Sequence, residues 1–121
     1  MVDVGELLGD IKKKIVDAEQ KEQELGREEQ QAFRYLDQGN REDTAELFSR
    51  EVGTAQEIAQ ELGQVEKEEL KVEEVLKDSR VSREIQQEFE QEEQKFEDIL
   101  EKFLEELEKL RQEADQLGNA V

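Results

Sequence analysis

Apolar residues recur in alternating steps of four and three along three long stretches of this 121-residue chain. An α-helix repeats every 3.6 residues, so a 4-3 pattern keeps one apolar seam turned toward a partner helix. Proline does not occur in the sequence, and the helices can therefore run without interruption. The pattern predicts an all-α fold made of long helices with coiled-coil-like heptad packing.

The high charge of the chain would argue against folding if its apolar residues were scattered. Charged residues make up 43% of the chain against 34% hydrophobic residues, and the formal net charge is -18. Such a balance is typical of disordered chains. Here the apolar residues fall on one stripe of each predicted helix instead of being scattered, so we expect the chain to fold.

The predicted helices span about residues 3–36, 43–77 and 83–116. Each would be about 50 Å long. Short connections between such helices force neighbours to run antiparallel. We therefore expect one domain over residues 1–121, an elongated up-down-up three-helix bundle. An alternative that uses the same seams is a helical hairpin that completes its core by dimerising.

Turn and capping residues mark the two breaks between the helices. Gly39 can adopt the left-handed conformation beyond a helix end. Asn40 or Asp43 would then cap the second helix, the latter through the capping-box spacing of residues 43–46. Ser79 and Ser82 are alternative N-caps for the third helix.

Three seams follow from the pattern. The first is Val4, Leu8, Ile11, Ile15, Ala18, Glu22, Leu25, Glu29, Ala32 and Leu36. The second is Phe48, Val52, Ala55, Ala59, Leu62, Val65, Glu69, Val72 and Leu76, with Ile58 assigned to the rim of the core. The third is Ile85, Phe89, Glu92, Phe96, Ile99, Phe103, Leu107, Leu110, Ala114 and Leu117. Folding them together places large residues beside small ones, as dense packing requires.

Two of the seam glutamates, Glu69 and Glu92, share one layer of the predicted bundle. Paired carboxylates could hold a hard cation such as Mg²⁺ or Ca²⁺, although more oxygen ligands would be needed. Di-iron bundles use histidine as well, and the sequence has none. The alternative is that these side chains reach out of the seam toward Lys12, Lys71 or Lys95. We therefore predict no metal site and keep the pair as a candidate.

Leu100 and Leu104 widen the apolar face of the third predicted helix beyond its seam. They could form a docking stripe for a partner helix or for a second copy of the chain. They could also be the rim of a three-helix core, which needs a broader stripe than a coiled-coil dimer. The sequence leaves both alternatives open.

Several function classes find no support in the residues. The chain has no Cys and no His, and no Gly-rich phosphate loop or activated serine occurs, so we expect a non-enzymatic protein without a cofactor. The only dense basic run is residues 12–14, which argues against direct nucleic-acid binding. No stretch approaches the ~20 apolar residues of a membrane span. The first nine residues do not resemble a signal peptide, so we expect a cytoplasmic protein.

The preferred hypothesis is a protein–protein interaction or scaffolding module. Leu100 and Leu104 would anchor a protein partner, and the surrounding carboxylates would steer a basic one, with homodimerisation as another possibility. A second hypothesis is an acidic chaperone or nucleic-acid mimic that binds a basic protein. A third is a carboxylate metal-binding bundle. Adaptation to a salty cytoplasm would explain the charge without any partner that binds the acidic surface.

Overall fold

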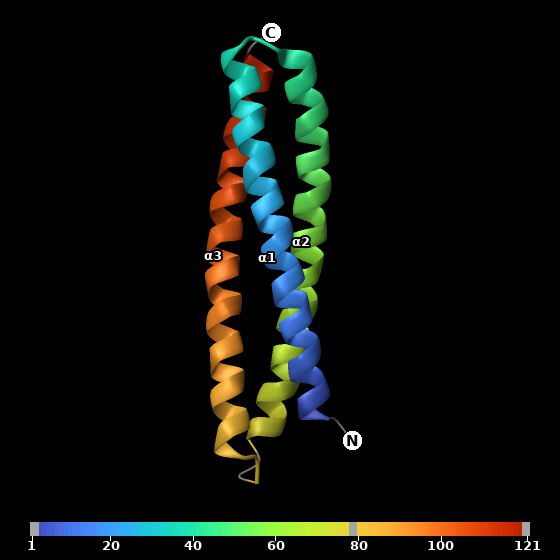
Figure 1. The fold of residues 1–121 in the computed structure, drawn as a ribbon, viewed down its shortest axis with the longest axis vertical. Coiled ribbons are helices and arrows are strands. Elements are labelled where there is room, and N and C mark those ends of the chain that lie inside the picture. The colour runs from blue at the N-terminus through green and yellow to red at the C-terminus, as the bar shows by residue number, and fades with distance from the viewer. Residues whose placement is uncertain (1–2, 78–79, 120–121) are drawn as a thin grey trace.

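Three long helices form a rod in the computed structural model, which describes residues 3–77 and 80–119. α1 spans Val4–Asp37, α2 spans Arg41–Leu76 and α3 spans Arg83–Asn119. All three pairs of helices are in contact. α2 runs opposite to α1, and α3 returns parallel to α1 (Figure 1). The predicted elongated, antiparallel three-helix bundle is confirmed.

The turn between α1 and α2 is built by Gly39 and Asn40. Gly39 has a φ of 73°, the left-handed conformation predicted for it. The Asn40 side chain accepts a hydrogen bond from the backbone N–H of Asp43 at 3.2 Å, so Asn40 is the N-cap of α2. Asp43 lies in the first turn of the helix, and the predicted capping box of residues 43–46 is wrong. The N-cap of the helix therefore lies three residues before the predicted capping box, at Asn40.

Side-chain caps also begin the other two helices. Asp3 accepts a hydrogen bond from the backbone N–H of Glu6 at 3.3 Å at the start of α1. Ser82 accepts one from the N–H of Ile85 at 3.3 Å at the start of α3. Ser82 is therefore the cap of the two predicted serines, and Ser79 lies outside the described residues. Each cap satisfies one N–H group that the helix itself leaves unpaired.

Ion pairs between helices mark which levels of the rod lie side by side. Lys14 pairs with Glu68 of α2, and Lys21, one heptad later, pairs with Glu61, one heptad earlier. Lys12 pairs with Glu88 of α3, at the end of the rod where α3 begins. These pairs connect the antiparallel α1–α2 neighbours and the parallel α1–α3 neighbours at the levels that the predicted seams imply.

The seam of α2 differs from the prediction near the first turn. Ile58 is fully buried, not at the rim, while Ala59 is exposed and Val52 is only half-buried. Phe48 is half-buried too, and Leu47 takes the inward place. The cause is the strict seven-residue spacing of the buried positions. Thr44, Glu51, Ile58, Val65 and Val72 are all buried.

The seam of α3 departs from the prediction for the same reason. Leu107 and Ala114 are exposed, and Glu106 and Glu113 are buried in their stead. Glu92, Ile99, Glu106 and Glu113 repeat every seven residues on one side of the seam. A helix that keeps a constant heptad phase cannot shift its inward face by one residue to avoid a polar side chain. The phase therefore brings glutamates inside and leaves leucines outside.

Candidate functional site

Three leucines of α3 form an exposed row on the bundle. Leu100 is 37% exposed, Leu104 is 58% exposed and Leu107 is 38% exposed. They follow one another at spacings of four and three residues, so they lie on one face of the helix. We call these residues the leucine row. Of the two predicted alternatives for Leu100 and Leu104, exposure favours a free apolar face over a packed rim.

The leucine row lies at the edge of α3 that faces α2. Glu93 of α3 interacts electrostatically with Glu69 and Glu73 of α2, which fixes that edge. Leu100 and Leu107 stand one and two heptads after Glu93 and therefore continue along the same edge. α2 presents a small exposed residue, Ala59, one heptad before Glu66 on its matching edge. A helix laid along this edge would meet apolar side chains from α3 and little steric resistance from α2.

Acidic side chains surround the leucine row. The exposed residues between and beside the leucines include Glu97, Glu101, Glu105 and Glu108. Glu108 is paired with Arg111 at 2.6 Å, which lowers the pKa of its carboxyl. The row is thus a short apolar strip bordered by carboxylates of α3. Such a strip favours a partner whose apolar face is bordered by lysine or arginine.

A second feature of the molecule is a set of glutamates in the interior. Seven glutamates are buried among the described residues: Glu22, Glu29, Glu51, Glu69, Glu92, Glu106 and Glu113. Burial without a partner disfavours the charged form of a carboxyl. Burial raises the pKa of Glu22 to about 7 and that of Glu69 to about 7. The interior is therefore sensitive to proton concentration near neutrality.

Glu51 and Glu113 form the deepest pair of these carboxyls. Both side chains are 0% exposed, and they approach one another from α2 and α3. Burial raises the pKa of both groups, and the Glu28 carboxylate of α1 raises that of Glu51 further. Within the described residues, no donor reaches the four oxygens of the two carboxylates. A hydrogen bond between the two groups therefore requires a proton on one of them.

Glu22 and Glu106 meet across α1 and α3 beneath a surface groove. The groove has a volume of about 370 Å³, and Gly26, Lys102 and Lys109 also line it. Lys109 pairs with Glu106 at 3.6 Å, and the Lys102 charge opposes the rise in the pKa of Glu22. A β-carbon at Gly26 would lie 3.8 Å from the Glu106 carboxylate, which is ordinary contact. The groove is thus lined by the carboxyls of Glu22 and Glu106 and by the lysines Lys102 and Lys109.

The structure does not join Glu69 and Glu92 into one site. Glu92 pairs with Lys95 at 3.4 Å and acts on Lys12 of α1, two of the lysines predicted to meet these carboxylates. Glu69 instead faces the carboxylates of α2 and α3, with Glu93 the strongest. In residues 3–77 and 80–119, no group of three or more acidic side chains could hold a metal ion. The arrangement therefore offers no ligand set for Mg²⁺ or Ca²⁺.

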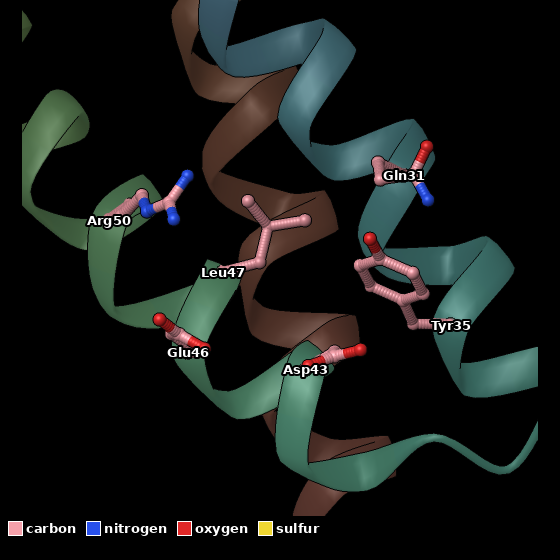
Figure 2. A pocket seen from close by; sticks show the side chains of 6 residues that line it. All are labelled: Gln31, Tyr35, Asp43, Glu46, Leu47 and Arg50. Atoms are coloured by element: carbon pink, nitrogen blue, oxygen red, sulfur yellow. The ribbon is translucent and has the colours of Figure 1, made fainter.

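A shallow hollow of about 290 Å³ lies between α1 and α2 beside the first turn. Figure 2 shows the Tyr35 ring of α1 on one side and Leu47 of α2 pointing into the space, with Asp43 below and Arg50 beyond. Tyr35 is half-buried and Leu47 is buried. Together they cover the interior at this end of the bundle. The lining mixes one cation with two acids and has no paired nucleophile and base.

The sequence interpretation missed Glu51, Glu106 and Glu113 as interior residues. The signal was present, because counting sevens back from Val65 reaches Glu51. Counting sevens forward from Ile99 reaches Glu106 and then Glu113. At these three positions the predicted seams instead stepped to the neighbouring apolar residue, Val52, Leu107 or Ala114.

Comparison with known proteins does not assign this chain to a family. No described helix is long and apolar enough to cross a membrane. No protein family, no curated protein and no solved structure matches the chain.

Proposed function

We propose that this protein is a non-enzymatic interaction module of the cytoplasm that binds a basic amphipathic helix of another protein along the leucine row. The observation that carries the proposal is the exposure of Leu100, Leu104 and Leu107 in one apolar strip. Large apolar side chains on one helix face are a feature of helix-docking surfaces. The partner helix would add a fourth helix beside α2 and α3.

Charge supports a basic partner over a second copy of this chain. The net charge of -18 makes two copies repel one another. The carboxylates beside the leucine row would attract lysine and arginine from a distance and speed the encounter. Burial of the leucines on docking would then hold the complex. Full burial of a side chain contributes about 1.5–3 kcal/mol, and each leucine would add only part of that because it is already partly covered.

The test is a titration with a designed helical peptide of about 20 residues, with leucines at helical spacing and lysines elsewhere. The variant Leu100→Lys with Leu104→Lys should bind this peptide about tenfold more weakly or worse, which corresponds to about 1.4 kcal/mol. The matched control is Val16→Lys with Leu70→Lys. It makes the same change in charge at two other exposed apolar residues and should bind like the parent protein. Equal loss in both variants would contradict the proposal.

The excess of acids favours a second candidate, an acidic chaperone or nucleic-acid mimic for a basic protein. The chain has 35 acidic residues against 17 basic ones. Binding by charge alone would fall steeply with salt and would not distinguish the two lysine variants. Binding through the leucine row would keep the difference between the variants at high salt. The salt series of the same titration therefore separates the two functions.

Homodimerisation through the same leucines is a further outcome that can be measured. Light scattering after size exclusion would then give a dimer for the parent protein and a monomer for Leu100→Lys with Leu104→Lys. That result would assign the leucine row to a second copy of the chain and exclude a basic helix as its first occupant.

A further inference from the structure

We propose that Glu51 and Glu113 form a proton-operated clasp between α2 and α3, closed while the two carboxyls share a proton and released when both are ionised. The clasp is separate from helix docking and does not depend on it. Its geometric basis is the meeting of two fully buried acids from different helices, with no donor among the described residues to satisfy them. A shared proton supplies the missing donor.

The surroundings of the clasp offer little compensation for two negative charges. On α1, Glu28 acts on Glu51, and Glu29, the next residue, is buried with both oxygens unpaired in the described part of the chain. On α3, Glu106 is buried two turns before Glu113. The adjacent cation of α2 is Arg50, and it acts on Glu28. The Glu28 carboxylate therefore adds to the negative charge around the pair from α1.

Ionisation of both carboxyls would leave two like charges in the interior. The cost of these charges falls when the helices separate and water solvates them. The part of the rod affected is the part that holds the pair, about residues 44–58 of α2 and 103–117 of α3. The other end of the α2–α3 contact holds buried apolar residues such as Val72 and Phe89, which do not titrate, and also Glu69, whose pKa burial raises to about 7. We therefore expect ionisation of the pair to open the bundle locally, at the end that holds Glu51 and Glu113.

Amide hydrogen exchange at pH 5 and pH 8, corrected for intrinsic rates, tests the clasp in the complete chain. In the parent protein, the amides of residues 103–117 should open about tenfold more often for each pH unit above 4.5 and below the raised pKa of the buried pair, because opening releases the shared proton there. The variant Glu51→Gln with Glu113→Gln should show little of this dependence, because two amides satisfy one another at any pH. The control Glu101→Gln with Glu105→Gln removes two exposed carboxylates of α3 and should keep it.

Two results would overturn the clasp. One is a double-glutamine variant that opens with the same pH dependence as the parent protein and the control. The other comes from the parent protein alone, so it holds even if the variant does not fold. Carbon-13 NMR of the glutamate carboxyls should show Glu51 or Glu113 titrating well above pH 6, and titration of both near 4.5 would exclude a shared proton at neutral pH.

Discussion

Glu51 of α2 and Glu113 of α3 face one another inside the bundle, each with no exposed surface. Their meeting follows from the heptad phase, since each lies a multiple of seven residues from a buried aliphatic residue of its own helix. The same phase turns Leu107 outward. The acidic interior and the exposed leucine row are therefore two consequences of one geometric constraint.

The heptad phase can be tested by truncating neighbouring apolar residues. Ile58 is fully buried, so Ile58→Ala should lower the free energy of unfolding by about 2–5 kcal/mol. Leu107→Ala should cost far less, because the leucine is already 38% exposed. Urea denaturation measures both values. Equal losses, or a larger loss at Leu107, would mean that the inward face of the bundle is the one the apolar residues alone suggested.

Stability should increase as the pH falls, which is the reverse of the behaviour of most salt-bridged proteins. Burial raises the pKa of Glu69 from 4.5 to about 7. Between these values the folded protein binds more protons than the unfolded chain, so the free energy of unfolding falls as the pH rises through that window. The stabilisation is complete below pH 4.5 and is lost by about pH 7. Urea denaturation at a series of pH values measures this slope.

Glu69→Gln isolates this residue from the rest of the acidic protein. The variant should have a smaller pH slope than the parent protein, because glutamine does not titrate. The exposed Glu74 provides the control, since Glu74→Gln makes the same chemical change at a solvated carboxylate. A slope that Glu69→Gln leaves unchanged would show that the Glu69 carboxyl has the same pKa in the folded and unfolded states.

The sequence predicted the three helices, their order and the turn at Gly39 because these depend on local rules. The seams near the first turn were harder, since steps of three and four from Leu62 lead equally well to Ile58 or Ala59. Packing against the other two helices decides between Ile58 and Ala59. Burying Ile58 removes more apolar surface from water, and Glu51, one heptad earlier, turns inward with it. The local pattern does not predict a buried glutamate at position 51, but a packed helix with this heptad phase must bury it.

Glycine substitutions distinguish the positions where glycine is needed from those where it is a weakness. Gly39 has a positive φ, so Gly39→Ala should destabilise the protein by about 1–2 kcal/mol. Gly63 lies inside α2, and a β-carbon added there would meet nothing within 4 Å. Gly63→Ala should therefore stabilise the protein by up to about 1 kcal/mol. Thermal denaturation followed by circular dichroism measures both, and a gain at Gly39 or a loss at Gly63 would contradict the backbone geometry.

The proposed function requires a basic helix to dock beside α2 and α3, along the edge that carries the leucine row. The most direct measurement is the map of backbone amide shifts in isotope-labelled protein titrated with the lysine–leucine peptide. Docking at the leucine row predicts the largest shifts in residues 97–108, with smaller ones in the matching part of α2 around Ala59. Shifts centred on Val16 and the α1–α3 side, or spread evenly over the acidic surface, would contradict it.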